Sequence, residues 1–431
     1  MTKKLILFVG IILCFFACKS KETSPVEKTQ GFVKIQNGQL VIDEKPYYFI
    51  GTNFWFGAIL GSEGQGGNRE RLAKELDFMK SIGITNLRVL VGADGLSEQE
   101  VKVRPTLQLE PGVYNDTIFD GLDYFMAELG KRDMYAVLFI NNSWDWSGGY
   151  SQYLEWAGKG SLPEEGISDW GKYQAYVTQY STCDECKELF FNHVKNVLGR
   201  TNRYTGLKYT EDPAIMAWQV GNEPRAFSQE AKEPFAKWLA EATALLRSLD
   251  GNHLITLGNE GTMGSEGDAG LYEKIHADPN VDYITIHIWP KNWSWLNIAD
   301  VPGSVDVAIE KTNEYLNTHL EIAQKLNKPM TIEEFGFPRD HHLYSLDDPT
   351  TARDKYYENI FQQVAASSAN KGLLAGCNFW AWGGLGRPVN TFWKPWDDYV
   401  GDPAQEEQGL NSVFDTDSTI ELIKKYASEL K

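Results

Sequence analysis

The chain has few cysteines and no excess of positive charge. Among its 431 residues, 59 Asp and Glu outnumber 41 Lys and Arg, so the formal net charge is -18 at pH 7. A protein of this charge repels nucleic acid and anionic lipid, because both are themselves negatively charged. We therefore expect no nucleic-acid partner, and a ligand that is neutral.

The five cysteines are not spaced as a structural metal site requires. Only Cys183 and Cys186 form a C-x-x-C pair, which supplies two of the four ligands that a structural zinc ion requires. Cys377 stands alone, and the other two cysteines lie near the N-terminus. The pair therefore favours a local disulfide or two inert thiols, and we expect no metal and no cofactor.

The N-terminus has the composition of an export signal. Two lysines precede an apolar run, residues 5–17, which is too short to span a bilayer. Cleavage of a signal peptide over residues 1–17 would leave Cys18 first, in a context that resembles a bacterial lipoprotein processing site. The polar segment 18–30 is expected to be a flexible tether. We expect an exported protein, either lipid-anchored to the cell envelope through Cys18 or secreted, and the mass of the mature N-terminus would distinguish the two.

No internal repeat, low-complexity segment or second domain boundary interrupts residues 31–431. Amphipathic segments with helical spacing occur at residues 69–81, 119–132, 188–198, 233–248 and 308–326. They alternate with eight strand-like apolar runs at residues 47–51, 84–91, 135–140, 214–220, 253–257, 281–288, 330–334 and 373–380. This rhythm predicts one α/β domain, a parallel (β/α)8 TIM barrel, with its functional groups at the carboxyl ends of the strands.

Two further features complete the predicted domain. Residues 32–49 alternate apolar and polar side chains around Asn37-Gly38, which predicts a short N-terminal β-hairpin over one end of the barrel. The segments 141–187 and 383–415 are expected to be long loops at the C-terminal face.

Two of the strand-like runs are followed by, or end in, a glutamate. Glu223 precedes Pro224, which cannot donate a hydrogen bond to a sheet and so ends the strand. Glu334 occupies the same kind of position in front of Phe335 and Gly336. A single such glutamate is more often a cap or an ion-pair partner, but two of them in matching contexts indicate a catalytic pair.

Polar, acidic and aromatic residues gather at the other strand ends. Tryptophan rings stack on the apolar face of a pyranose, while nearby amides and charges bind its hydroxyls, so this rim is typical of a site for a sugar chain. The candidate contacts are Trp55, Arg88, Trp144, Asn222, Arg225, Glu260, His287, Trp289 and Trp380.

These residues stand in motifs that resemble the endo-β-1,4-mannanases of glycoside hydrolase family 5, subfamily 7. The resemblance extends from about residue 45 to about residue 415. Asn222-Glu223-Pro224 and Glu334-Phe335-Gly336 are typical of the wider family. Arg225 and the run Asn141-Asn142-Ser143-Trp144 are the features that favour mannan.

The resemblance implies a retaining glycosidase that needs no cofactor. Glu223 would be the general acid and base, and Glu334 the nucleophile. Glu333 is the rival for the second role, but neighbouring residues of a strand face opposite ways. Arg88 would place a positive charge beside the nucleophile.

Further roles follow from the same resemblance. Asn222 would donate to the 2-hydroxyl of the reacting sugar, and Trp380 would form the floor beneath it. Trp289 stands where family members often carry a tyrosine that bonds to the nucleophile, and its indole N–H is expected to donate in the same direction. Phe56 stands where a tryptophan is usual, so one sugar platform is expected to move to Trp55.

The expected substrate is β-mannan or glucomannan, as polysaccharide or oligosaccharide, bound by a monomer. An exo-acting β-mannosidase is an alternative if the segments 141–187 and 383–415 block one end of the cleft, and a β-1,4-glucanase of the same family is another. A non-catalytic glycan-binding lipoprotein is a third alternative, but such a protein would not need to keep both glutamates.

Overall fold

The structure, a computed structural model, describes residues 30–96, 102–162, 169–395 and 397–430. The predicted signal peptide 1–17, Cys18 and the tether up to residue 29 lie outside the described residues. Within the described ranges, no helix combines the length and the hydropathy needed to cross a membrane.

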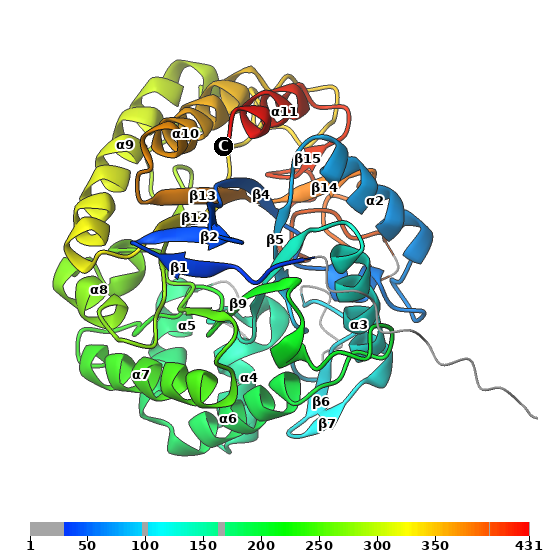
Figure 1. Cartoon of the computed structure of the whole chain (residues 1–431), viewed down its shortest axis with the longest axis vertical. Coiled ribbons are helices and arrows are strands. Elements are labelled where there is room, and N and C mark those ends of the chain that lie inside the picture. The colour runs from blue at the N-terminus through cyan, green and yellow to red at the C-terminus, as the bar shows by residue number, and fades with distance from the viewer. Residues whose placement is uncertain (1–29, 97–101, 163–168, 396, 431) are drawn as a thin grey trace, which may run out of the picture.

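Eight parallel strands form a barrel surrounded by helices (Figure 1). The strands are β4 (Phe49–Asn53), β5 (Asn86–Leu90), β8 (Tyr135–Phe139), β9 (Ile215–Gln219), β10 (Leu254–Thr256), β11 (Ile284–Ile288), β12 (Met330–Phe335) and β13 (Leu374–Phe379). Their order around the sheet is β10-β9-β8-β5-β4-β13-β12-β11. The backbone N–H of Asp282 donates to the carbonyl of Ile255, and that of His287 to the carbonyl of Glu260, which joins the β10 and β11 edges. The predicted (β/α)8 barrel is confirmed.

Helices cover the outside of the barrel. They are α1 (Gly57–Leu60), α2 (Arg69–Ser81), α3 (Asp116–Gly130), α4 (Gly149–Trp156), α5 (Trp170–Val177), α6 (Asp184–Leu198), α7 (Lys232–Leu249), α8 (Ala269–His276), α9 (Val301–Leu326), α10 (Thr351–Asn370) and α11 (Thr419–Glu429). The helix α2 has the predicted bounds, whereas α9 begins seven residues before the predicted residue 308. The reason is local: the Asp300 side chain caps α9 by accepting a hydrogen bond from the backbone N–H of Gly303, and Pro302 stands in the first turn.

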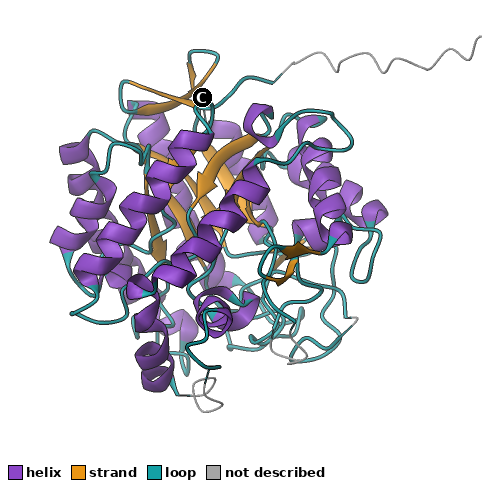
Figure 2. Cartoon of the chain, turned by 90° about the horizontal axis from the view of Figure 1, so that it is seen from below, coloured by secondary structure: helices purple, strands orange, loops and turns teal. Residues whose placement is uncertain are grey.

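The predicted hairpin lies at the N-terminal end of the barrel. Strands β1 (Lys34–Gln36) and β2 (Gln39–Ile42) are antiparallel, and β3 (Lys45–Pro46) extends the sheet. Asn37 and Gly38 both have positive φ values, 53° and 74°, as a tight two-residue turn requires. Figure 2 shows this small sheet at one end of the molecule and the long loops at the other.

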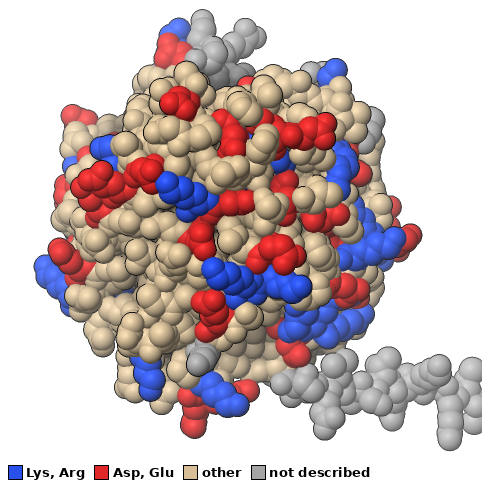
Figure 3. Space-filling view, turned by 90° about the horizontal axis from the view of Figure 1, so that it is seen from above, with Lys and Arg blue, Asp and Glu red and all other residues tan. Residues whose placement is uncertain are grey.

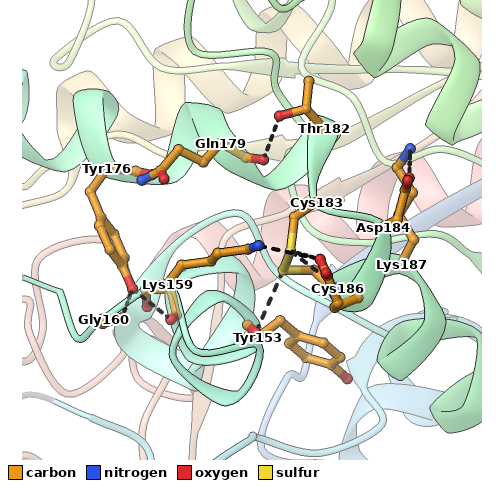
Figure 4. Close-up of a disulfide and its surroundings, with 12 residues drawn as sticks. Tyr153, Lys159, Gly160, Tyr176, Gln179, Thr182, Cys183, Asp184, Cys186 and Lys187 are labelled. Carbon is orange, nitrogen blue, oxygen red and sulfur yellow. Dashed lines mark hydrogen bonds and ion pairs between the residues drawn. A yellow bond between two sulfur atoms is a disulfide. The ribbon is translucent and has the colours of Figure 1, made fainter.

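The two long segments carry secondary structure of their own. Residues 141–187 include α4 and α5, and residues 383–415 begin within β14 (Trp382–Gly384) and include β15 (Val413–Phe414). Another short pair, β6 (Gln108–Glu110) and β7 (Val113–Tyr114), lies between β5 and α3. Cys183 and Cys186 form a disulfide at the start of α6, and the Cys186 sulfur lies 3.6 Å from the Tyr153 carbonyl oxygen (Figure 4).

Charges of both signs are mixed on the surface. On the face drawn in Figure 3, acidic and basic side chains alternate without a continuous basic patch.

The helices α1 and α3 approach closely enough that their backbones touch. A Cβ atom on Gly121 of α3 would lie 2.1 Å from the carbonyl oxygen of Ala58 in α1. A Cβ on Gly130, at the end of the same helix, would meet only the Ala214 side chain, at 3.9 Å.

We therefore expect Gly121→Ala to lower the free energy of unfolding by about 1–3 kcal/mol, since the backbones must separate. Gly130→Ala is the matched control and should change it by less than about 1 kcal/mol, because alanine favours the helix and meets ordinary contact distances. Chemical denaturation followed by circular dichroism measures both values, and equal effects of the two substitutions would contradict the close packing.

Candidate active site

The predicted residues converge on a cleft at the carboxyl ends of the strands. The cleft has a volume of about 810 Å³. Eight of the predicted residues line it: Trp144, Asn222, Glu223, Arg225, Glu260, Trp289, Glu334 and Trp380. Arg88 and His287 are buried directly beneath them.

The backbone holds Glu223 in an unusual conformation. Its φ is 50°, in the left-handed region that non-glycine residues seldom occupy. Its N–H donates to the Gly258 carbonyl at 3.0 Å, and its own carbonyl accepts from the Ser143 hydroxyl at 2.6 Å. These bonds from neighbouring strand ends fix the conformation and direct the carboxylate into the cleft.

The two glutamates and His287 form one compact group. A carboxylate oxygen of Glu223, one of Glu334 and a ring nitrogen of His287 all lie within 4.8 Å of one another. Nδ1 of His287 lies 2.7 Å from Glu223 Oε1 and 3.3 Å from Glu334 Oε2. This separation has the scale of the roughly 5–5.5 Å between the carboxyl groups of retaining glycosidases, and is shorter than the ~6.5–9.5 Å of inverting ones.

Arg88 lies beneath this group with no exposed surface. Its Nη1 donates to Glu334 and, at 3.0 Å, to the side-chain oxygen of Asn53. Its Nε donates to Gln219 at 2.9 Å, and its Nη2 donates to Asn222 at 2.8 Å. Each of its nitrogens therefore has an acceptor, as a buried guanidinium requires.

Glu333 points away from the cleft into the barrel. Its carboxylate accepts hydrogen bonds from Gln219 Nε2 at 2.5 Å and from the Tyr283 hydroxyl at 3.1 Å. The cleft lining includes Glu334 but not Glu333, as the alternation of side chains along a strand predicts.

The pKa values of the compact group are shifted together. Burial disfavours the charged form of His287, but the charge of Glu334 and the hydrogen bonds to both glutamates outweigh it and raise the pKa of His287 to about 9. Burial acts against ionisation of Glu223 too, yet the His287 bond and charge, the charge of Arg225 and the 2.5 Å bond from Trp144 Nε1 lower the pKa of Glu223.

Glu260 and Arg225 form a buried ion pair beside Glu223. Their closest atoms are 2.6 Å apart, and the guanidinium lies 5.6 Å from the centre of the Trp144 ring. Burial is the main reason that the pKa of Glu260 rises to about 8, although the charge of Arg225 opposes this shift. The sequence indicated both residues separately and did not predict that they would pair.

Two expectations about tryptophans differ from the structure. Trp55 is only 1% exposed and does not line the cleft, because its indole N–H donates to the Gly401 carbonyl at 2.7 Å and its ring packs against Trp146 and Tyr399. Trp55 is therefore not a sugar platform. Trp289 lines the cleft, and the centre of its ring lies 6.2 Å from that of Trp380. Among the described residues, however, Glu334 is bonded by Arg88 and His287 and not by the indole of Trp289.

Several cleft residues were absent from the sequence prediction. They are Asp145, Trp170, Met263, Lys291, Asn292, Pro403, Gln405, Glu406, Glu407, Leu410 and Asn411. Most stand in loops without periodic patterns, so only the fold brings them to the site. Trp170 is an exception, because it is the first residue of α5. It is 53% exposed, and its ring is tilted by 33° against that of Trp144, with a centroid separation of 4.9 Å.

Comparison with known proteins gives related sequences and structures. A protein-family model described as GH family 5 beta-mannosidase-like matches residues 30–431. A putative mannan endo-1,4-beta-mannosidase 9 of Oryza sativa subsp. japonica is 30% identical over 360 residues, which cover 81% of each chain. A mannan endo-1,4-beta-mannosidase 7 of Arabidopsis thaliana is 29% identical over 81% of this chain and 77% of its own.

Among solved structures, a family 5 mannosidase from Rhizomucor miehei is similar over almost the whole chain. It superposes with a TM-score of 0.85 and 33% identity, over 93% of this chain and 97% of that one. A point mutant of the Rhizomucor enzyme, at 32% identity over 92% of this chain and 97% of that one with a TM-score of 0.85, was solved in complex with mannosyl-fructose.

The His287 shift can be measured by NMR titration of the histidine rings. We expect His287 to titrate near pH 9, whereas burial lowers the pKa of His193 to about 4. Because the pKa of His287 is raised, its contribution to stability is complete below its ordinary value of 6.5 and is lost as the pH rises through 9. Glu334→Gln removes one facing charge and should lower the pKa of His287. Titration of His287 below pH 6.5 would contradict the arrangement.

Proposed function

The chain belongs to the β-mannosidase-like group of glycoside hydrolase family 5, and we propose that it hydrolyses β-1,4-mannosidic bonds with retention of configuration. The observation that carries this proposal is the clustering of Glu223, Glu334 and His287 within 4.8 Å. Arg225 and the Asn141-Asn142-Ser143-Trp144 run support its placement in subfamily 7.

In the first step, the Glu334 carboxylate attacks the anomeric carbon, and the bond to the leaving oxygen breaks. Glu223 gives that oxygen its proton, so the leaving sugar departs as an alcohol and the reacting sugar becomes an ester of Glu334. In the second step, Glu223 takes a proton from water, the water oxygen attacks the anomeric carbon, and Glu334 is released as a carboxylate.

His287 lets Glu223 serve in both steps. One proton in their 2.7 Å hydrogen bond gives either an imidazolium with a carboxylate or a neutral imidazole with a carboxylic acid. These two arrangements contain the same number of protons, so the pair can hold a proton for the leaving group even though the pKa of Glu223 is lowered. Arg88 remains bonded to Glu334 and compensates its charge.

The reacting sugar is proposed to lie over Trp380, between Glu334 and Asn222. The amide nitrogen of Asn222 uses one hydrogen to donate to Asn142 at 3.1 Å, and its second hydrogen is available for a sugar 2-hydroxyl. That hydroxyl is axial in mannose and equatorial in glucose, so this contact discriminates between the two sugars. The names of the Oryza and Arabidopsis relatives and the mannosyl-fructose complex support mannose.

Replacement of the two glutamates should separate their duties. Glu334→Ala removes the nucleophile and should abolish hydrolysis of every substrate. Glu223→Ala should slow mannan hydrolysis by about 10²–10⁴-fold, but it should retain activity on an aryl β-mannoside whose leaving group departs without a proton. Initial rates on mannan, an aryl β-mannoside, carboxymethyl cellulose and xylan test this. Equal losses of activity on mannan and on the aryl β-mannoside would contradict the roles assigned to the two glutamates. Comparable wild-type rates on mannan and cellulose would contradict the preference for mannose and leave only the membership of glycoside hydrolase family 5.

For the mode of action, exo cleavage is a second candidate besides the endo action that the relatives' names suggest. Trp55 is enclosed by residues of both long loops. Trp146 belongs to the segment 141–187, and Tyr399 and Gly401 belong to the segment 383–415, so the Trp55 ring does not border the cleft. The two long segments that could block one end of the cleft, 141–187 and 383–415, therefore meet at Trp55. The Rhizomucor structure is named a mannosidase and not an endo-mannanase, which favours exo cleavage as a candidate.

Digestion of mannopentaose labelled at its reducing end distinguishes the modes. An exo enzyme that acts from the non-reducing end should release unlabelled mannose first and leave labelled chains that shorten by one sugar at a time. Reduction of the labelled end to an alditol is the control and should not change this order. Early appearance of mannobiose and mannotriose in comparable amounts would instead establish endo action.

A further inference from the structure

We propose that Glu333, the residue next to the nucleophile, is a positioning residue of the active site. Through the amide of Gln219 it holds Arg88 in the orientation in which the guanidinium bonds to Glu334. The inference rests on the proposed function, because it takes Glu334 to be the nucleophile. It gives a role to the one glutamate of the adjacent pair that does not line the cleft.

A shift in strand pairing accompanies the approach of Glu333 to Arg88. Along β12, Ile332 and Glu334 pair with two consecutive residues of β11, so Glu333 between them is passed over. Bulges of this kind redirect side chains and are common beside active sites. The backbone carbonyl of Glu333 accepts a hydrogen bond from the Asn53 side chain at 2.8 Å, and its carboxylate lies 3.7 Å from Nε of Arg88.

The amide of Gln219 connects Glu333 to Arg88. Its Oε1 accepts a hydrogen bond from Nε of Arg88 at 2.9 Å, and its Nε2 donates to Oε2 of Glu333 at 2.5 Å. Gln219 and Arg88 have no exposed surface, and Glu333 is almost completely buried. Bulk water is therefore not available to replace either of these bonds when one of them is lost.

Only one orientation of this amide satisfies both of its neighbours. A guanidinium has only donors and a carboxylate only acceptors, so the amide oxygen must face Arg88 and the amide nitrogen must face Glu333. A side chain without an acceptor at position 333 would leave the buried nitrogen of Gln219 unpaired, which favours other positions of the amide. Arg88 would then lose the acceptor that fixes its Nε.

The bond between Gln219 and Arg88 matters for Glu334 because the guanidinium is a rigid planar fork. A rotation that releases Nε also turns Nη1, which bonds to Glu334, away from the nucleophile. Burial raises the pKa of Glu333 and so weakens the tendency of its carboxyl to carry a charge. Its hydrogen bond with Gln219 does not require that charge, and this bond is therefore the contact that holds Arg88.

The test compares two replacements that both remove the charge of Glu333. In Glu333→Met no acceptor faces Gln219, and kcat on 4-nitrophenyl β-mannoside should fall by roughly 10- to 100-fold. KM should change little, because neither Glu333 nor Gln219 lines the cleft. Glu333→Gln should keep kcat within about threefold of the wild type. Its side-chain oxygen can accept from Gln219 while its amide nitrogen donates to the Tyr283 hydroxyl.

Gln219→Met interrupts the same bridge from its other end and should lower kcat by a similar factor. The double variant with Glu333→Met and Gln219→Met should be little slower than either single variant, because each change already breaks the connection. Losses that multiply in the double variant would show that the two residues act independently and would overturn the inference. A Glu333→Gln variant as slow as Glu333→Met, or a Glu333→Met variant with wild-type kcat, would overturn it too.

Tyr283→Phe is the matched control. It removes the other hydrogen bond to Glu333, at 3.1 Å, without interrupting the bridge to Arg88, and should keep kcat within about threefold of the wild type. Circular dichroism checks that each variant is folded, and Gln219→Met carries the test if Glu333→Met does not fold. A loss in Tyr283→Phe equal to that in Glu333→Met would indicate general damage and overturn this inference alone. A wild type that cannot hydrolyse the mannoside would overturn the proposed function and this inference with it.

Discussion

The geometry of the site depends on one buried guanidinium, that of Arg88. A buried charge is tolerated only when it is paired and its donors are used, and here the acceptors come from different strands. Asn53 ends β4, Gln219 ends β9, Asn222 follows β9, and Glu334 stands in β12. Because all four must face the same planar group, the strand ends are held in one relative position. Lysine could not replace Arg88, since a single ammonium cannot reproduce this fork.

The same guanidinium explains why two adjacent glutamates differ. Nε of Arg88 lies 3.7 Å from Glu333, while Nη1 bonds directly to Glu334. Burial raises the pKa of Glu333, and its oxygens are already held by Gln219 and Tyr283. The positive charge is therefore left to compensate Glu334, the only one of the two that borders the cleft. Side-chain alternation along β12 places Glu334 and not Glu333 in the cleft, and the bond from Arg88 compensates the charge of Glu334.

Local sequence patterns predicted the features that local chemistry determines. The eight apolar runs became the eight barrel strands, but β9 ends at Gln219, so Glu223 stands in the loop four residues beyond the strand and not directly at its end. The fate of Trp55 could not be predicted in this way, because the residue that accepts its hydrogen bond, Gly401, is 346 positions away along the chain. Residues 383–415 were expected to form a loop, but the cleft residues within it, such as Gln405 and Glu406, were not predicted. The loop is shaped by bonds around Asp402 and has no periodic pattern that a sequence can reveal.

The two ends of the cleft show how the mode of action can be independent of the catalytic motifs. At one end Trp170 is 53% exposed beside Trp144, while at the other Trp55 is 1% exposed beneath Trp146 and Tyr399. Only Trp170 is exposed enough to stack on a sugar, and the difference between the two rings comes from what the long loops place over each of them. The motifs around Glu223 and Glu334 are identical whether those loops are open or closed. A resemblance based on those motifs can therefore identify the bond that is cleaved, but the position of cleavage along a chain is determined by loop contacts between distant residues.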